Sequence, residues 1–161
     1  MLTPAEVIKL LNLTPNTDEG GYYASTYVSE TTIPNYPGQR AICSAIYYFI
    51  DQSTFSGLHT VSSDMLYHFY SGNPVEVLLL HTDGSHQLTI FGGDLAAGQL
   101  PMKVIPGGTW MGSRMLGDGS YALMGVSMAP GFDFHDYKIG IRADLQKQYP
   151  DIPELIAEFT R

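Results

Sequence analysis

The sequence has 161 residues and a net charge of −8, and only 15% of its residues are charged, against about 25% in a typical globular protein. This length predicts one domain over residues 1–161, and the scarcity of Lys and Arg disfavours binding to nucleic acid or to an anionic membrane. The single cysteine, Cys43, excludes an internal disulfide and the multi-cysteine zinc sites. Neither a secretory signal pattern nor a long apolar run is present, so we expect a cytoplasmic protein without a membrane partner.

The first predicted element is a short N-terminal helix. Thr3 is placed to act as the N-cap, Pro4 occupies the first helical position, and Glu6 completes a capping box. Apolar residues then recur at helical spacing. We expect the helix to end at about Asn12, before Pro15.

The middle of the chain has the pattern of a series of short β-strands. Aromatic, β-branched and other apolar residues dominate segments that are separated by Gly, Pro and Asp turns. These segments cover residues 22–28, 41–50, 55–59, 65–70, 75–81, 88–91, 102–105, 109–115, 121–127 and 138–141. Asp83-Gly84 predicts one β-hairpin and Gly117-Asp118-Gly119 predicts another. Many short strands without long helices between them predict a β-sandwich or a β-barrel.

The C-terminal part of the sequence returns to a helical pattern. Residues 144–149 predict one short helix, which Pro150 ends. Residues 153–159 predict another.

Five segments, taken in order, resemble one protein family. They are FSGLHTVSSDMLYHFYSG at 55–72, EGGYY at 19–23, SAIYY at 44–48, VIPGGTW at 104–110 and APGFDF at 129–134. From about residue 4 to residue 142 the chain resembles the cupins, and more narrowly the subfamily known as DUF985 or cupin 5. The resemblance implies an all-β double-stranded β-helix (jelly roll), here with a short N-terminal helix and short C-terminal helices, and usually a homodimer.

The resemblance also marks the positions at which cupins usually bind a metal ion, namely two His, a Glu and a last His. His59 falls at the first His, whereas Val61, Met65 and Met111 fall at the other positions. A divalent ion needs several nitrogen or oxygen ligands, so His59 alone does not hold one. Two thioethers and one imidazole suit Cu(I) in principle, but methionine there is more simply core filler. We therefore expect no metal ion and no cofactor.

His59 is the first candidate catalytic residue, because an imidazole accepts a proton near neutral pH. Some cupin-fold sugar epimerases, which the chain resembles in fold, use a barrel histidine as the base and a tyrosine as the acid. Tyr67 is our candidate for that acid, and Tyr47 and Tyr137 stay open as alternatives. For His59 the alternative is a purely structural histidine whose ring is hydrogen-bonded in the core.

We expect His59, Met65, Tyr67 and Trp110 to line one ligand cavity inside the barrel. Strand alternation places Met65 and Tyr67 on one face and His68 on the other. Trp110 follows the Pro-Gly-Gly bend, and its ring suits stacking on a planar ligand, with core packing as the alternative.

Tyr47 and Arg114 complete the candidate ligand-binding residues, since arginine suits a phosphate or carboxylate. The first functional hypothesis is a metal-independent pocket for a nucleotide, a nucleotide-sugar or a sugar-like molecule, with epimerisation or isomerisation as its candidate reaction. The second is a non-enzymatic ligand-binding protein, and the third is a metal-dependent enzyme with unusual ligands. The strands at 22–28 and 41–50 carry apolar side chains on both faces, so we expect a homodimer.

Overall fold

The helices and strands of the computed structural model, which describes residues 2–34, 36 and 39–161, follow the predicted order. The helices are α1 (Pro4–Leu10), α2 (Arg142–Gln148) and α3 (Pro153–Glu158), with the 3-10 helix η1 (Phe134–Asp136) before α2. The strands are β1 (Thr14–Pro15), β2 (Tyr22–Val28), β3 (Ser44–Asp51), β4 (Ser56–Thr60), β5 (Asp64–Gly72), β6 (Val75–Leu80), β7 (His86–Phe91), β8 (Met102–Ile105), β9 (Trp110–Met115), β10 (Tyr121–Ala129) and β11 (Lys138–Ile139). The prediction of an all-β protein with short helices at both ends is confirmed.

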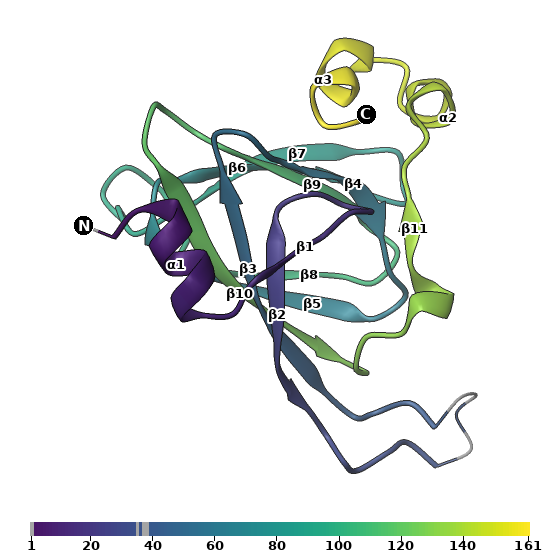
Figure 1. Cartoon of the computed structure of the whole chain (residues 1–161). Coiled ribbons are helices and arrows are strands. Elements are labelled where there is room, and N and C mark those ends of the chain that lie inside the picture. Colours follow the sequence, from purple (N-terminus) through teal and green to yellow (C-terminus); the bar gives the residue numbers. More distant parts are fainter. Residues whose placement is uncertain (1, 35, 37–38) are drawn as a thin grey trace.

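Two antiparallel sheets face each other and enclose the core (Figure 1). The larger sheet has the strand order β1-β2-β3-β10-β5-β8, and the smaller sheet has the order β11-β4-β9-β6-β7. Alternate residues of both sheets point inward and form the main hydrophobic cluster, which includes Tyr48, Val61, Met65, Tyr67, Val77, Leu79, Phe91, Ile105, Met111 and Met124. Each sheet keeps an edge strand on either side, so the described residues form an open sandwich rather than the closed barrel that we expected as one alternative.

Of the two predicted hairpins, one is confirmed and one is wrong. Strands β6 and β7 pair across the Asp83-Gly84 turn, where the Asp83 side chain accepts a hydrogen bond from the Ser85 main-chain nitrogen at 2.9 Å. Strands β9 and β10 do not pair, because β9 lies between β4 and β6 while β10 lies between β3 and β5. The segment around Gly117 therefore carries the chain from one sheet to the other. A turn signal in the sequence says where the chain reverses, but not which strand it then pairs with.

Helix α1 begins as predicted and ends slightly earlier. The Thr3 hydroxyl accepts a hydrogen bond from the Glu6 main-chain nitrogen, and the Glu6 carboxylate accepts one from the Thr3 nitrogen, so the capping box is present. The helix ends at Leu10, since Asn12 has a φ of 52° and lies outside the helical region. Val7 packs with Phe49 in a cluster on the outer face of the larger sheet. The chain itself thus covers part of the apolar face for which we expected a partner.

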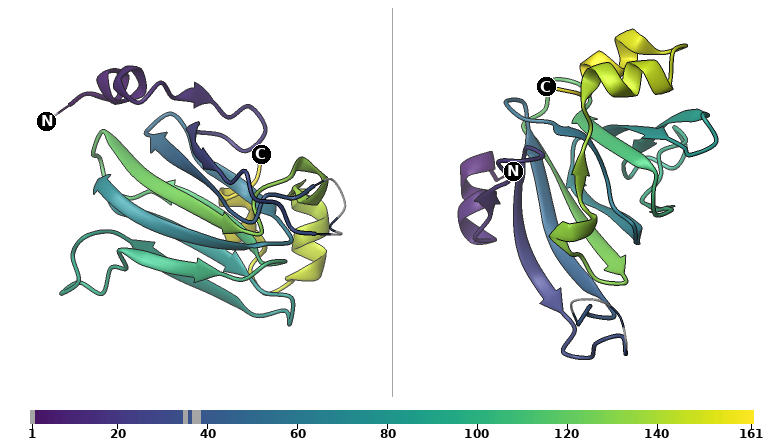
Figure 2. Two further views of the ribbon diagram at one scale, coloured as in Figure 1. Left: turned by 90° about the horizontal axis from the view of Figure 1, so that it is seen from below. Right: turned by 90° about the vertical axis from the view of Figure 1, so that its right-hand side faces the viewer.

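Helices α2 and α3 cover the outer face of the smaller sheet (Figure 2). Their apolar residues join those of β4 and β6 in a second hydrophobic cluster, made of Leu58, Leu78, Leu80, Leu145, Tyr149, Ile156 and Phe159. Strands β4 and β6 of the smaller sheet are therefore buried on both faces. None of the helices in the described part of the chain is long and apolar enough to cross a membrane.

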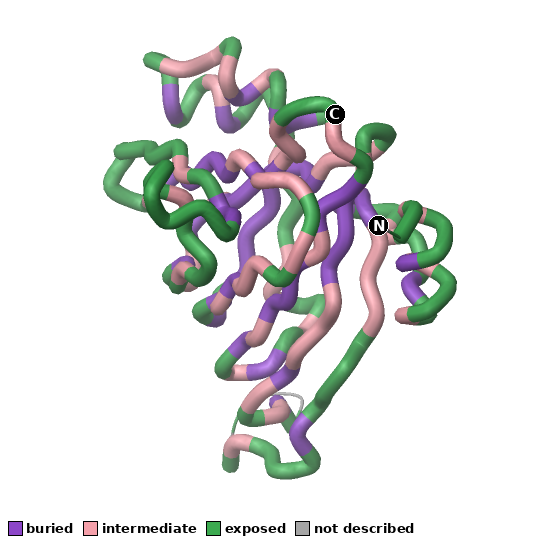
Figure 3. The backbone as a smooth tube through the Cα atoms, turned by 90° about the vertical axis from the view of Figure 1, so that its left-hand side faces the viewer, coloured by how far each residue is buried: buried purple, intermediate pink, exposed green. Residues whose placement is uncertain are grey.

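Burial is concentrated where the two sheets overlap (Figure 3). The first half of β2 is partly buried and its second half is exposed, because there β2 and β3 extend beyond the smaller sheet (Figure 1). The central strand β10 is mostly buried, and long antiparallel ladders join it to β3 and β5. Residues of all three strands line the cavity between the sheets.

Candidate functional site

A cavity of about 290 Å³ opens between the two sheets. Its wall is formed by β2, β3, β5 and β10 of the larger sheet and by β4 of the smaller one. Its mouth is formed by residues 15–19 and by the segment around η1. The lining residues are Pro15, Asn16, Thr17, Asp18, Glu19, Tyr23, Ser25, Val28, Ser44, Ala45, Ile46, Tyr48, His59, Val61, Met65, Tyr67, Val126, Met128, Phe132, Phe134 and Tyr137. The cavity is thus mostly apolar, with a few polar groups at defined places, as ligand sites usually are.

His59 is held in one orientation by its own strand. It lies on β4, is 3% exposed, and its Nδ1 atom is 2.9 Å from the carbonyl oxygen of Gly57. A carbonyl oxygen only accepts hydrogen bonds, so Nδ1 carries the proton. In the neutral ring Nε2 is then an acceptor, and it lies 3.8 Å from Oε2 of Glu19. The acceptor nitrogen of the neutral ring therefore faces the Glu19 carboxylate.

Glu19 reaches this position from the loop between β1 and β2. Its Oε1 atom accepts a hydrogen bond from the Ser56 hydroxyl at 2.7 Å, and its Oε2 atom accepts one from the Asn16 side chain at 3.3 Å. The loop turns at Gly20, whose φ of 106° and whose close approach to the carbonyl oxygen of Phe55 leave no room for a side chain. A nearly buried carboxylate is thus oriented by hydrogen bonds and aimed at the cavity.

Three tyrosines with different environments surround the pair formed by His59 and Glu19. The Tyr48 hydroxyl donates a hydrogen bond to the carbonyl oxygen of Gly20 at 2.8 Å. The Tyr137 ring stacks on His59 with centroids 5.6 Å apart, and its buried hydroxyl has no hydrogen-bond partner within the described residues. Tyr67 lies on β5 and is 2% exposed.

Tyr67 and Tyr137 keep their protons at neutral pH. Burial raises the pKa of Tyr67 well above its usual value, and the nearby Glu19 and Tyr137 raise it further. Burial likewise raises the pKa of Tyr137, with Glu19 and Asp18 adding to the effect. Their hydroxyl groups are therefore hydrogen-bond donors toward an oxygen atom of a ligand.

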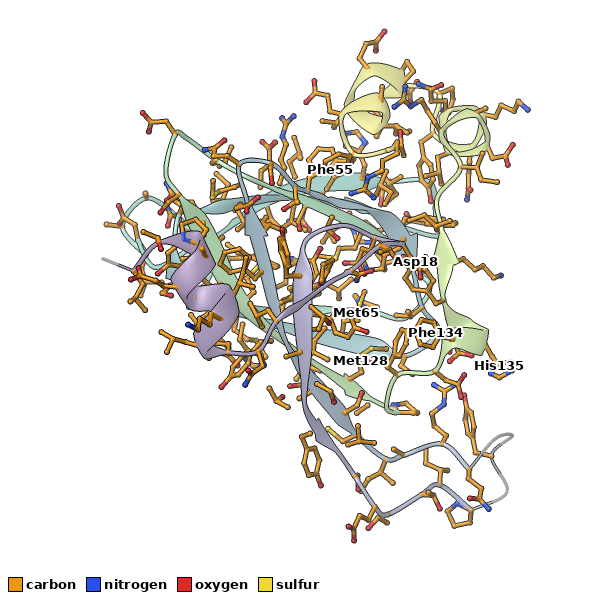
Figure 4. The ribbon with its side chains drawn as sticks, in the orientation of Figure 1. Asp18, Phe55, Met65, Met128, Phe134 and His135 are labelled. Atoms are coloured by element: carbon orange, nitrogen blue, oxygen red, sulfur yellow. The ribbon has the colours of Figure 1, made fainter. Side chains whose placement is uncertain are left out.

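The mouth of the cavity is aromatic. Phe132 and Phe134 both line it, with their rings 4.9 Å apart and edge to face, and Phe134 is 70% exposed. Arg40 fastens this segment by donating hydrogen bonds to the carbonyl oxygen of Gly131 at 2.7 Å and to Asp136 at 2.6 Å. In Figure 4 the labelled Phe134 lies on the side of η1 that faces Met65 and Met128, whereas His135 lies outside the sandwich.

The comparisons with known proteins decide the family. The model of the cupin superfamily family DUF985 matches residues 5–140. The chain belongs to this cupin family. It is similar over its whole length to a structure from Shewanella oneidensis, with 30% identity, a TM-score of 0.91 and coverage of 100% of this chain and 99% of that one. A hypothetical protein from Leishmania major gives the same TM-score of 0.91, with 26% identity and 99% coverage of both chains.

More distant cupins share only the fold. Bacillus subtilis oxalate decarboxylase aligns with a TM-score of 0.57 and 12% identity, over 92% of this chain and 37% of that one. The expected cupin fold is confirmed by these alignments and by the two facing sheets. No curated protein gives a significant match.

The metal site of other cupins does not fit the residues of this cavity. Bacillus subtilis oxalate decarboxylase has Mn(II) centres. Here the cavity offers the His59 imidazole and the Glu19 carboxylate, while Val61, Met65 and Met111 stand at the other ligand positions of the cupin motif and are buried in the core. No cluster of three or more His, Cys, Asp or Glu side chains exists in residues 2–34, 36 and 39–161. Asp18 also lines the cavity but forms no such cluster with His59 and Glu19, so these side chains do not supply the four to six ligands that a divalent ion needs.

The structure brings together three of the side chains that we expected around the ligand, namely His59, Met65 and Tyr67. His68 points to the other face of β5, as predicted. Trp110 does not line the cavity: it packs against the cluster under α2 and α3, and its neighbour Met111 points inward instead. The expectation for Trp110 is wrong because both faces of β9 are apolar, and alternation then leaves its direction undecided.

Tyr47 and Arg114 also lie away from the cavity. Tyr47 faces the outer side of the larger sheet, where its ring meets Tyr70 edge to face at 6.2 Å, and its neighbour Tyr48 is the one that points inward. Arg114 lines a separate hollow of about 210 Å³ and forms ion pairs with Glu76 at 2.7 Å and with Glu158. Two carboxylates already neutralise the Arg114 guanidinium, which leaves it poorly placed to bind an anionic ligand.

Glu19 is a residue of this candidate site that the sequence did not lead us to expect there. It stands in the EGGYY segment at 19–23, which served only to carry the family resemblance. The available signal was an acidic side chain directly before two glycines in a chain with few charged residues. The two phenylalanines at the mouth, Phe132 and Phe134, were missed in the same way because only the fold brings residues 129–134 to the cavity.

Proposed function

We propose that this cupin binds a compact, phosphate-free small molecule in the cavity between its sheets and moves a proton on it without a metal ion. The observation that carries the proposal is the arrangement of His59, whose Nε2 atom is an acceptor in the neutral ring, beside the Glu19 carboxylate at 3.8 Å. Such a pair is suited to general-base catalysis, because the carboxylate stabilises the imidazolium that forms when the ring takes a proton.

The candidate reaction is isomerisation or epimerisation at a carbon atom next to a carbonyl group. His59 Nε2 removes the proton, and the electron pair of the broken C–H bond moves toward the carbonyl oxygen. The hydroxyl group of Tyr67 or Tyr137 donates a hydrogen bond to that oxygen, for which burial has kept it protonated. Return of the proton from His59 to a carbon atom completes the reaction, so no oxidant or cofactor is consumed.

The character of the cavity supports a sugar-like ligand better than a nucleotide. Within the described lining there is no Lys or Arg, and Asp18 and Glu19 are both present. A phosphate group would meet two carboxylates there and no counter-charge. The volume of about 290 Å³ is at the small end of the roughly 300–1,000 Å³ typical of ligand pockets, which suits a single ring.

Deuterium exchange tests this proposal. Small keto-sugars without phosphate are incubated with the protein in heavy water, and loss of the proton signal next to the carbonyl group is followed by NMR. We expect exchange with the unmodified protein and with His135→Gln, whose side chain is 94% exposed, but none with His59→Gln. Saturable binding without exchange identifies a non-enzymatic binding protein, and exchange that survives His59→Gln contradicts the assigned base.

A further inference from the structure

Two hydrogen-bond acceptors meet in the lining of the cavity. His59 Nε2 accepts because Nδ1 donates to Gly57, and Glu19 Oε2 accepts because a carboxylate has no proton to donate. The atoms are 3.8 Å apart, which is too far for a direct hydrogen bond, and both residues line the same cavity. Asn16 donates to Oε2 at 3.3 Å, and a carboxylate oxygen accepts more than one such bond. A ligand group with two donors satisfies both acceptors at once.

The charge around these acceptors is negative. Asp18 lies next to Glu19 in the lining, and the lining residues that the structure describes include no Lys or Arg. Arg161 donates hydrogen bonds to the main-chain carbonyls of Glu19 and Phe55 and does not line the cavity. The two carboxylates therefore repel an anion that enters the cavity, and they attract a cation.

The remaining surface suits a cation that carries an organic body. Tyr67 and Tyr137 present aromatic rings inside, and Phe132 and Phe134 present them at the mouth. The negative face of an aromatic ring attracts a cation, and this attraction is stronger where water is excluded. The thioether of Met65 adds a polarisable apolar contact. Together these contacts offset the free-energy cost of removing a cation from water.

We propose that the ligand of this cavity carries a protonated nitrogen group with at least two N–H donors, which bind His59 Nε2 and Glu19 Oε2. This inference goes beyond the proposed function and does not depend on it: it names a ligand class for the same site, a small organic ammonium, amidinium or guanidinium compound. While such a ligand donates to His59 Nε2, that nitrogen is not free to remove a proton from carbon. The ring or chain attached to the nitrogen lies among the aromatic side chains, and its oxygen atoms accept from the tyrosine hydroxyl groups.

Three probes of one shape and different charge test the inference. Benzamidinium is a cation with a two-donor head, benzamide is neutral, and benzoate is an anion. Binding to the full chain is measured by isothermal titration calorimetry at neutral pH and constant ionic strength. We expect benzamidinium to bind about tenfold or more tightly than benzamide, because hydrogen bonds to a charged group are the stronger ones, and benzoate to bind weakest.

Variants show whether the preference arises at the proposed atoms. Glu19→Gln keeps the shape and removes the charge, so it should weaken benzamidinium binding about tenfold and leave benzamide binding unchanged. Glu154→Gln is the matched control, since it removes the same charge from an exposed position on α3 and should change neither affinity. A ¹⁵N NMR spectrum of the unmodified protein with benzamidinium adds a readout that does not depend on a variant. There we expect His59 Nε2 to show the chemical shift of an unprotonated, hydrogen-bonded nitrogen.

Equal or tighter binding of benzamide or benzoate overturns the inference, and so does a protonated His59 Nε2 in the benzamidinium complex. Absence of binding by all three probes also overturns it. The proposed function is judged separately by deuterium exchange into keto-sugars. Exchange that depends on His59, without any preference for benzamidinium, therefore rejects the cationic ligand and leaves the proton-transfer function standing.

Discussion

The guanidinium group of Arg161 holds the main chain of Glu19: its Nη1 atom donates a hydrogen bond to the Glu19 carbonyl oxygen at 2.6 Å. A second hydrogen bond, from Nη2 to the carbonyl oxygen of Phe55 at 2.9 Å, ties the loop that carries Glu19 to the residue before β4. The Arg161 guanidinium also lies over the Phe55 ring, 4.6 Å from its centroid. The carboxylate beside His59 is therefore positioned partly by a residue far away in the sequence.

Arg161→Ala should weaken both the fold and the site. Loss of the two hydrogen bonds is expected to lower the free energy of unfolding by about 1–2 kcal/mol, measured by urea denaturation. Because the Glu19 loop loses its tether, benzamidinium binding should also fall. Lys147→Ala serves as the control, since that side chain is 81% exposed and should change neither quantity. Unchanged binding in Arg161→Ala would show that Arg161 does not position Glu19.

Two tyrosine substitutions should have opposite effects on stability. Tyr48→Phe removes a buried hydrogen bond to Gly20 and should lower the free energy of unfolding by about 1–3 kcal/mol. Tyr137→Phe removes a buried hydroxyl that has no partner in the described structure, so it should leave stability unchanged or raise it by up to about 1 kcal/mol. If Tyr137 donates to the ligand, this variant still lowers deuterium exchange. A marked loss of stability in Tyr137→Phe would contradict the finding that the Tyr137 hydroxyl has no hydrogen-bond partner among the described residues.

Met65→Glu restores the carboxylate that the cupin motif places at this position, and we expect the variant to bind no stoichiometric metal. Val61 and Met111 still lack their imidazole groups, so two of the four ligand positions of the cupin motif stay without a nitrogen donor. Metal content is measured by elemental analysis of protein purified without a histidine tag and dialysed with Mn(II) or Zn(II). Met65→Gln is the matched control for the burial of a polar group. One metal ion per chain in Met65→Glu or in the unmodified protein would falsify the metal-free assignment.

The Asp136 carboxylate should make stability depend on acid pH. The Ser62 hydroxyl foremost, and also Arg40, hold the pKa of Asp136 below its ordinary value of 3.8. The folded state thus favours the ionised form, and this stabilisation is present above the ordinary value and is lost as the pH falls through the lower folded pKa. Asp136→Asn removes it, so the unfolding free energies of the two proteins should differ at neutral pH and approach each other in acid.

Urea denaturation between neutral pH and pH values below the ordinary value of 3.8 measures this effect. Asp144→Asn is the control, because its side chain is 67% exposed and its ion pair with Lys147 is a weak surface contact. A constant difference between the unmodified protein and Asp136→Asn across this range contradicts the linkage.

The homodimer stays a prediction, and the outer face of the larger sheet indicates where to test it. Tyr70, Met102 and Val104 lie there on the neighbouring strands β5 and β8 and are 53%, 42% and 46% exposed. Light scattering at micromolar concentration should give the mass of two chains, and Val104→Lys should shift it toward one. Leu95→Lys, at a loop position that is 67% exposed, should leave the mass unchanged. A single chain for the unmodified protein contradicts the prediction.

Local signals in the sequence determined the elements of this protein. The capping box at Thr3 and Glu6, the hairpin at Asp83-Gly84 and the alternation of Met65 with His68 all depend on residues within a few positions of one another. Their geometry is therefore set by backbone and side-chain chemistry that is visible in a short window. The family motifs, read in order along the chain, were also sufficient for the cupin fold.

Only the tertiary structure decided which of these elements meet at the cavity. Glu19 reaches His59 because the β1–β2 loop folds across the end of β4, a contact between segments far apart in the sequence. Trp110 points outward because α2 and α3 supply a second apolar layer, so both faces of β9 are buried and alternation alone does not distinguish them. Whether a side chain is core or site depends on what the rest of the chain places opposite it, and a short window of sequence does not contain that information.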